Sequence, residues 1–207
     1  MKVLMINGSA RQGSNTHIAL EEIQKVLSQY DIESEIFDMS IDPVRDCTSC
    51  GACSKLGRCV FDDDDVNAII EKAKESDGFI FGTPVYYAHP SGRILSLLDR
   101  LFYAGGSAFA NKPGAAVACA RRAGTTASLD VLNKYFTIAG MPVVSSTYWN
   151  VIHGRKIGES VQDEEGVQTM KNLAHNMAWL LKCIELGRQN GILPQGNEKT
   201  KFTNFIR

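Results

Sequence analysis

The feature that most constrains the fold is a regular alternation of short apolar runs with longer amphipathic stretches. Five runs predict strands at residues 2–7, 33–39, 78–82, 114–120 and 143–147. The first, third and fourth show little polar alternation, which is typical of parallel strands that helices cover on both faces. Helical patterns follow these strands at residues 15–29, 64–75, 91–103, 125–139 and 166–186. The alternation predicts an α/β fold built on a doubly wound, five-stranded parallel sheet.

Length and composition indicate how the chain is organised. It has 207 residues, of which 44% are hydrophobic and 22% charged, the profile of a globular domain. We expect that domain at residues 1–188, with a Cys-rich insertion at 46–61 and a polar C-terminal tail at 189–207. The net charge is −1 without a basic block, so neither nucleic acid nor a membrane is an expected partner. No apolar stretch approaches the roughly 18 residues of a membrane span and the apolar N-terminus is too short for a signal peptide, so a cytoplasmic location is expected.

The loop after the first strand has the composition of a phosphate-binding turn. Its sequence, NGSARQGSNT at residues 7–16, joins a buried strand to a helix whose first backbone N–H groups attract an anion. A single phosphate monoester fits best, because Ser14 replaces the lysine of G-x-x-x-x-G-K-[ST] and the G-x-G-x-x-G pattern is not matched. Taken alone, the loop is explained equally well as an ordinary capped helix start.

A second loop, FGTPVYYAHPSGRI, stands at the end of the third predicted strand. Thr83 and Pro84 halt that strand, and Val85, Tyr86 and Tyr87 follow at the carboxyl edge of the sheet. Ligands bind doubly wound sheets at this edge, where aromatic and backbone groups can hold the flat ring of a flavin. Two tyrosines packed beneath a loop are the alternative.

Together the two loops resemble those of the NAD(P)H-dependent FMN reductase family, a branch of the flavodoxin-like proteins. The resemblance spans roughly residues 1–185 and implies a flavodoxin-like sheet in the order 2-1-3-4-5. It also implies bound FMN and a flavin-dependent oxidoreductase with no catalytic side chain, because the cofactor carries the chemistry. The phosphate would be held by Ser9, Arg11, Ser14, Asn15 and Thr16, and the ring framed by Thr83, Pro84, Val85, Tyr86 and Tyr87.

Members of this family often carry a glycine-rich third loop after strand four, and this chain has CARRAGTT there. We expect Arg121 and Gly124 to complete the cofactor site, since an arginine can stabilise a reduced, anionic flavin or bind the phosphates of NAD(P)H as a substrate. Solvated arginines at a helix start are the alternative for Arg121 and Arg122. The segment at 147–154 is expected to lie at an interface or in the core.

Four cysteines lie close together in DCTSCGACSKLGRC, residues 46–59. Their spacing, C-x2-C-x2-C-x5-C, opens like the bacterial ferredoxin run, and Gly51 and Gly57 let the backbone curl round a cluster. Zinc sites usually separate two cysteine pairs by a dozen or more residues, so the compact spacing favours iron–sulfur. The spacing also resembles that of the iron–sulfur flavoproteins, a subgroup of the same family, which implies one [4Fe–4S] cluster on Cys47, Cys50, Cys53 and Cys59.

Other chemistry-bearing residues receive structural interpretations. The run Asp62–Asp65 is expected to cap the next helix in solvent. Cys119 and Cys183 lie in a strand and a helix pattern and are expected to be inert core thiols. The motif cysteines could also be free of metal, or form disulfides in air.

Three functions stay open on the sequence. The first is an FMN-dependent oxidoreductase with a [4Fe–4S] cluster that moves electrons between a one-electron carrier such as ferredoxin and an unknown acceptor. The second is an NAD(P)H-dependent FMN, quinone or azo reductase without a functional cluster. The third is a zinc-stabilised binding module that is not an enzyme. The resemblance implies homodimers or homotetramers with cofactors near subunit boundaries.

Overall fold

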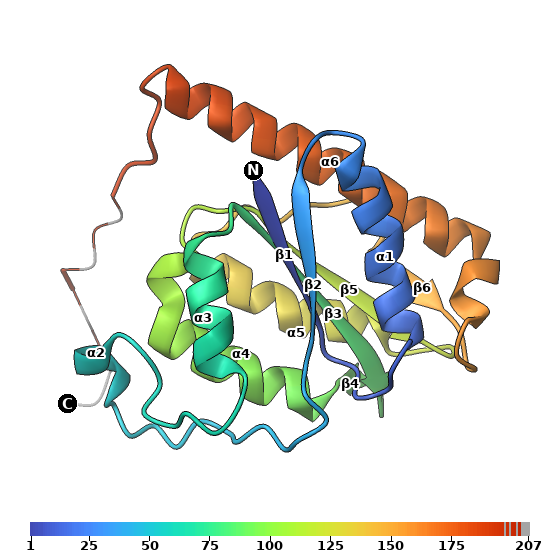
Figure 1. The fold of residues 1–207 in the computed structure, drawn as a ribbon, viewed down its shortest axis with the longest axis horizontal. Coiled ribbons are helices and arrows are strands. Elements are labelled where there is room, and N and C mark those ends of the chain that lie inside the picture. The colour runs from blue at the N-terminus through green and yellow to red at the C-terminus, as the bar shows by residue number, and fades with distance from the viewer. Residues whose placement is uncertain (197, 199, 202, 204–207) are drawn as a thin grey trace.

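The structure is a computed structural model and describes residues 1–196, 198, 200, 201 and 203. Its sheet has the strand order β2-β1-β3-β5-β6, and β4 pairs with β3 as the second arm of a hairpin (Figure 1). Strand pairing is parallel along that order and antiparallel between β3 and β4. The predicted order 2-1-3-4-5 is confirmed, with β5 and β6 in the fourth and fifth places. The strands are β1 (Lys2–Asn7), β2 (Glu33–Asp38), β3 (Gly78–Tyr86), β4 (His89–Pro90), β5 (Gly114–Ala120) and β6 (Val151–His153).

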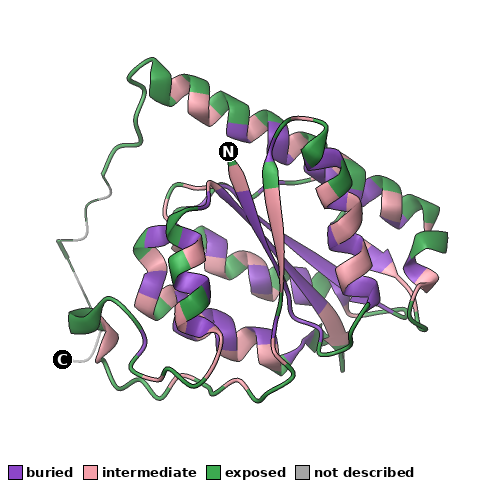
Figure 2. Cartoon of the chain, viewed as in Figure 1, coloured by how far each residue is buried: buried purple, intermediate pink, exposed green. Residues whose placement is uncertain are grey.

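Helices cover both faces of the sheet. The longer ones are α1 (Asn15–Ser28), α3 (Val66–Lys74), α4 (Gly92–Gly105), α5 (Thr125–Ile138) and α6 (Glu164–Gln189). One face packs against α1 and α6, and the other against α3, α4 and α5 (Figure 1). The central strands β1, β3 and β5 are therefore buried on both faces, as Figure 2 shows, which explains their continuous apolar runs.

Two helix starts at the carboxyl edge of the sheet, those of α1 and α4, are capped by serines. Ser14 Oγ accepts a hydrogen bond from the backbone N–H of His17 at 3.1 Å, and Ser91 Oγ accepts one from Ile94 at 3.4 Å. Such caps satisfy N–H groups that have no partner within the helix. Ser14 belongs to the first loop, and Ser91 is bonded to it, because Ser91 Oγ donates to the carbonyl of Gly8 at 3.1 Å. The caps therefore fix the loop as well as the helices.

The prediction of a fifth strand at 143–147 is wrong in position. Val143 makes an isolated parallel bridge with Gly114, after which the chain leaves the ladder and pairs again with β5 at Val151. The apolar character of the earlier stretch reflects burial of Val144 against α6 and β5 and not continued pairing. The strand that lies beside the end of β5 is β6, whose central residue Ile152 is completely buried.

The third strand is longer than predicted and continues through Pro84. Pairing of β3 with β1 ends at Gly82, whereas pairing of β3 with β5 continues as far as Pro84. Proline has no backbone N–H to donate, and this is tolerated at position 84 because β1 no longer pairs with β3 there. The extension carries Val85 and Tyr86 past the sheet into the hairpin with β4.

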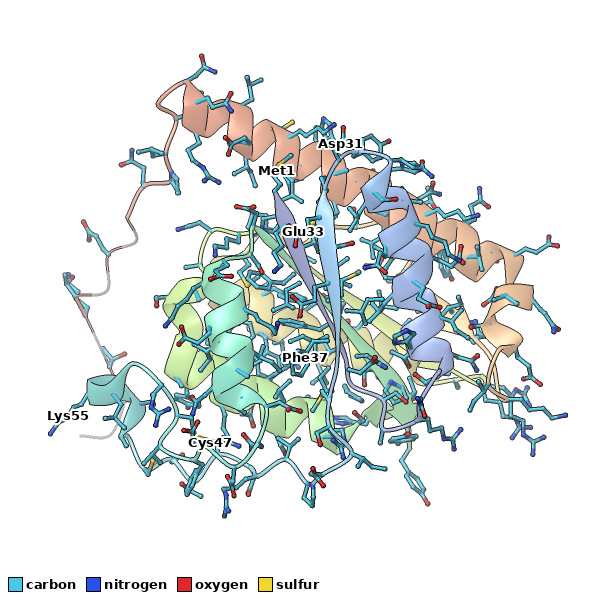
Figure 3. The ribbon with its side chains drawn as sticks, in the orientation of Figure 1. Met1, Asp31, Glu33, Phe37, Cys47 and Lys55 are labelled. Carbon is cyan, nitrogen blue, oxygen red and sulfur yellow. The ribbon has the colours of Figure 1, made fainter. Side chains whose placement is uncertain are left out.

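The Cys-rich insertion leaves the sheet after β2 and reaches well beyond it. It contains the four-residue helix α2 (Cys53–Leu56), which stands apart from the end of β3 (Figure 1). Figure 3 labels Cys47 on this segment and Lys55 at its outer end. Two 3-10 helices complete the described structure, at Gly106–Ala108 and Glu159–Gln162.

The C-terminal region differs from the predicted tail at its start. Helix α6 extends to Gln189 and is closed by Gly191 at a φ of 77°, a left-handed conformation that suits glycine at a helix end. The predicted tail falls partly outside the described residues, at 197, 199, 202 and 204–207. Among the described residues, no helix is both long and apolar enough to cross a membrane.

Candidate functional site

The loops after β1, β3, β5 and β6 meet around one cavity at the carboxyl edge of the sheet. Its volume is about 220 Å³. A cavity at this edge, beside the point where the strand order reverses, is where doubly wound sheets bind nucleotides. The residues that line it are Ser9, Arg11, Ser14, Asn15, Thr16, Pro84, Val85, Tyr86, Cys119, Ala120, Arg121, Gly154, Arg155 and Ile157.

The first loop is a tight turn held by its own side chains. The N–H of Gly8 donates to the carbonyl of Gly82 at 2.8 Å, and a Cβ on Gly8 would lie 2.8 Å from Ile94, so only glycine fits. Asn7 Oδ1 accepts from the N–H of Ser9 at 3.1 Å, and Ser9 Oγ accepts from the N–H of Arg11 at 3.2 Å. The loop thus holds its hydroxyls and the start of α1 around the cavity, where they can bind an anion.

Asn15 lines the cavity, but its amide is bonded to a distant loop. Its Nδ2 donates to the carbonyl of Lys156 at 2.8 Å, while its Oδ1 accepts from the N–H groups of Gly158 at 3.0 Å and Ser160 at 3.2 Å. The side chain that the sequence assigned to the phosphate therefore holds residues 154–160 against α1. This loop brings Arg155 to the cavity.

The second loop is only partly in the cavity. Pro84, Val85 and Tyr86 line it. Thr83 is completely buried beneath it, where its Oγ1 accepts from the N–H of Ser91 at 3.0 Å, so it supports the loop and does not line the cavity. Tyr87 is fully exposed at the tip of the β3–β4 hairpin, with a positive φ of 51°.

Only part of the third loop lines the cavity as well. Arg121 lines the cavity, whereas Arg122 and Gly124 do not. Gly124 has a φ of 94°, and a Cβ there would lie 2.4 Å from Ala88 Cα, so this glycine lets the hairpin tip pack on the start of α5. Cys119 is buried, as predicted, but it belongs to the cavity wall. Burial raises the pKa of its thiol to about 12.

Five lining residues were missed by sequence reasoning. Cys119 and Ala120 end β5, and their position at the carboxyl end of a buried strand was a usable signal. Gly154, Arg155 and Ile157 follow β6, and only the correct placement of the fifth strand would have revealed them. From the segment at 147–154, only Gly154 reaches the cavity; Tyr148 and Trp149 are exposed and in edge-to-face contact.

The four motif cysteines line a second, separate cavity. Its volume is about 250 Å³, which is room for more than a single water molecule. Within the described residues, the two cavities have different lining residues throughout. Among the described residues, no group of three or more His, Cys, Asp or Glu could hold a single metal ion. The lining residues are Cys47, Thr48, Ser49, Cys50, Gly51, Cys53, Cys59, Val60, Phe61, Arg100, Tyr103 and Ala104.

The buried ion pair beside this second cavity was not predicted. Asp64 belongs to the acidic run that was expected in solvent, yet its side chain is 5% exposed and pairs with the buried Arg100 of α4. Burial works to lower the pKa of Arg100, but hydrogen bonds to Asp64 and Cys59 outweigh it and raise that pKa, so the side chain is a cation. Outside the cavity, Cys183 is exposed, which corrects its expected place in the core.

Comparisons with known proteins agree with this architecture. Residues 1–156 match the family model described as NADPH-dependent FMN reductase. An iron–sulfur flavoprotein of Methanocaldococcus jannaschii is 32% identical over 193 residues, covering 89% of this chain and all of that one. Among solved structures, RosB with 8-demethyl-8-formylriboflavin-5′-phosphate has a TM-score of 0.71 at 14% identity, covering 100% of this chain and 95% of its own.

A flavodoxin from the domain Archaea has a TM-score of 0.60 at 15% identity, over 88% of this chain and 99% of the flavodoxin. At such identities the two solved structures show the fold, which is flavodoxin-like. The family match covers most of the chain, and it agrees with a cavity built from the expected loops. The chain therefore belongs to the NADPH-dependent FMN reductase family and is a flavin-dependent oxidoreductase that uses FMN.

Proposed function

We propose that this FMN-dependent oxidoreductase also holds a [4Fe–4S] cluster on Cys47, Cys50, Cys53 and Cys59, and transfers electrons between a one-electron carrier and an unidentified acceptor. The observation that carries the proposal is that all four cysteines of one short insertion line a single cavity. Membership of an oxidoreductase family contradicts the third hypothesis, a binding module that is not an enzyme.

The cysteine cavity fits a polyatomic group held by thiolates. Ser49, Gly51 and Gly57 have positive φ angles of 51°, 70° and 65°, so the backbone turns sharply around the cavity. The cysteines are free of disulfides and differ in depth, from exposed Cys50 to buried Cys59. The iron–sulfur flavoprotein that is similar over most of this chain supports the same assignment.

For the flavin, we propose that the first loop and the start of α1 bind the phosphate, with Ser9, Ser14 and Thr16 as hydroxyl donors and Arg11 as the cation. Pro84, Val85 and Tyr86, which line the cavity, would frame the ring, and Arg121 would complete this part of the site. When bound, FMN supplies one- or two-electron chemistry, and an iron–sulfur cluster supplies single electrons. The side chains of this site bind and orient the cofactor.

A pair of cysteine variants tests the cluster directly. Cys50→Ser removes one proposed ligand, and Cys183→Ser removes an exposed cysteine on α6 far from the insertion in sequence. Iron, acid-labile sulfide and FMN are measured per chain after anaerobic purification. We expect Cys50→Ser to lose iron and sulfide but keep FMN, and Cys183→Ser to match the wild type. Unchanged iron in Cys50→Ser would contradict the ligand assignment, and loss of FMN would contradict the separation of the two sites.

A second candidate function, reduction of FMN, quinones or azo compounds by NAD(P)H, is favoured by the charge of the flavin cavity. Three arginines, Arg11, Arg121 and Arg155, line it, and no aspartate or glutamate is found among its lining residues in the part of the chain that the structure describes. Only one phosphate belongs to FMN, so the remaining positive charge suits the phosphates of a nicotinamide nucleotide. Anaerobic mixing of the FMN-loaded protein with NADPH tests this: bleaching of the flavin absorbance supports it, and an unchanged spectrum argues against it.

The proposed assembly is a homodimer or homotetramer in the cytoplasm. The two cavities share no lining residue, and α2 stands apart from the flavin loops within one chain (Figure 1). Mass photometry of the cofactor-loaded protein tests the assembly, and a monomer at micromolar concentration would refute it.

A further inference from the structure

The Cys-rich insertion is anchored to α4 by one buried cation. The side chain of Arg100 is 1% exposed and is paired with Asp64, whose side chain is 5% exposed. Arg100 Nη1 also donates to the carbonyl of Arg45 at 3.1 Å, and Nη2 to that of Phe61 at 3.4 Å. A buried charge is tolerated only when it is paired and hydrogen-bonded, and this guanidinium meets both conditions.

One N–H of Arg100 is directed at sulfur. Its Nε lies 3.2 Å from Cys59 Sγ, and Cys59 is the most buried of the four motif cysteines. A planar guanidinium can serve the sulfur and the Asp64 carboxylate at once, which a lysine ammonium cannot do in the same fixed geometry. Arg100 therefore links the deepest proposed ligand to a buried charge pair.

We infer that Arg100 is a positioning residue for the proposed iron–sulfur site, where it orients the sulfur of Cys59 and raises the reduction potential of the cluster. The inference rests on the proposed function. Reduction makes a cluster more negative, and hydrogen bonds to its sulfur ligands together with nearby positive charge favour the reduced state.

Asp64 acts in the opposite direction. Its carboxylate partly neutralises Arg100, and both side chains are buried, so solvent screens neither charge well. Removal of the Arg100 charge should therefore lower the potential, whereas removal of the Asp64 charge should raise it. A purely structural role for the pair would not predict shifts of opposite sign.

Arg45 provides a matched control on the same segment. Its guanidinium carbon lies 4.6 Å from the centre of the Phe61 ring, and its side chain is 47% exposed and paired with the exposed Asp63. A change at Arg45 removes one positive charge near the cavity, but a charge that water already screens. The carbonyl that accepts from Arg100 belongs to the backbone and survives the substitution.

The experiment is an anaerobic redox titration of the cofactor-loaded protein, followed by electron paramagnetic resonance of the reduced cluster. The wild type is compared with Arg100→Gln, Arg100→Lys, Asp64→Asn and Arg45→Gln, each at measured iron and sulfide content. We expect the midpoint reduction potential of the cluster to become more negative in Arg100→Gln and to shift less far in the same direction in Arg100→Lys. It should become more positive in Asp64→Asn and stay unchanged in Arg45→Gln.

The outcomes separate the two proposals. A wild type without iron overturns the cluster and this inference together. A loaded wild type whose midpoint equals those of Arg100→Gln and Asp64→Asn overturns the role of Arg100 alone. If Arg100→Gln fails to fold or to hold iron, the sign of the shift in Asp64→Asn decides: a positive shift supports the role, and no shift or a negative one overturns it.

Discussion

The side-chain amide of Asn15 hydrogen-bonds to the carbonyl of Lys156 at 2.8 Å across 141 positions of the chain. With two further bonds from Gly158 and Ser160, it fastens the loop after β6 to the start of α1. Arg155 reaches the flavin cavity from this loop. Asn15 therefore shapes the cavity through the loop that it holds.

Asn15→Ala should weaken FMN binding about tenfold, because the loop that carries Arg155 loses its attachment. The N–H of the buried Ser160 would also be left unsatisfied, which costs about 1–3 kcal/mol of folding free energy. Quenching of flavin fluorescence during titration of the apoprotein measures the dissociation constant, where a tenfold change corresponds to about 1.4 kcal/mol.

Asn176→Ala is the matched control for that experiment. Asn176 on α6 also donates through its amide to a backbone carbonyl, that of Ser145 at 2.8 Å, but this bond is exposed and Asn176 does not line the flavin cavity. Wild-type affinity is expected for this variant. Equal FMN affinity in Asn15→Ala and the wild type would contradict the role of Asn15 in holding this loop for FMN binding.

Gly124→Ala should destabilise the fold and displace the β3–β4 hairpin. The positive φ of 94° disfavours alanine, and its Cβ would collide with the backbone of Ala88. We expect a loss of about 1–3 kcal/mol in the free energy of unfolding, measured by urea denaturation. Gly92→Ala, in the first turn of α4 with open space where the new Cβ would lie, should be neutral or slightly stabilising. An equal stability of both variants would contradict the close packing at Gly124.

Cys119 should resist alkylation in the folded protein although it lines the flavin cavity. Its pKa of about 12 leaves roughly one thiolate in ten thousand at pH 8, and it is 6% exposed. Treatment with iodoacetamide followed by peptide mass analysis should modify the exposed Cys183 before Cys119. Faster modification of Cys119 than of Cys183 at pH 8 would contradict this placement.

A pH-dependent contribution to stability is expected from Glu35 on β2. A hydrogen bond from Lys72, at 2.6 Å, lowers the pKa of this carboxyl below its ordinary 4.5, against a smaller opposing effect of burial. When folding lowers the pKa of a carboxyl, the group stabilises the folded state at every pH above its pKa in the unfolded chain. This contribution is lost as the pH falls through the pKa of the folded state.

Glu35→Gln should accordingly reduce stability at pH 7 by less than about 1 kcal/mol, because the pair is partly exposed, and should have little effect near pH 3. Urea midpoints at the two pH values provide the comparison. A larger effect of the substitution at pH 3 than at pH 7 would reverse the expected sign.

The sheet and its loops were predictable because their signals are local. β1 and β5 begin and end as predicted, since buried parallel strands leave unbroken apolar runs. The first and second loops were found by turn residues placed directly after such strands. β6 was misplaced because three residues with one buried side chain carry almost no pattern, while the apolar residues nearby serve the core.

The remaining errors concern long-range partners. Arg100 lies among the apolar positions of α4, and its partner Asp64 is 36 positions away, so the sequence cannot distinguish their buried pair from solvated charges. Asn15 carries an amide that can donate a hydrogen bond to a phosphate, and only the folded chain shows that this amide is already bonded to another loop. Cys183 lies on the outer side of α6, which a helical pattern with few apolar residues did not reveal.

The most direct test of the account is the cofactor content of the wild-type chain isolated without oxygen. Two independent cavities predict about one FMN, four irons and four acid-labile sulfides per chain. Protein that carries FMN with zinc or with no metal at all would contradict the assignment of the four cysteines to an electron-transfer cluster.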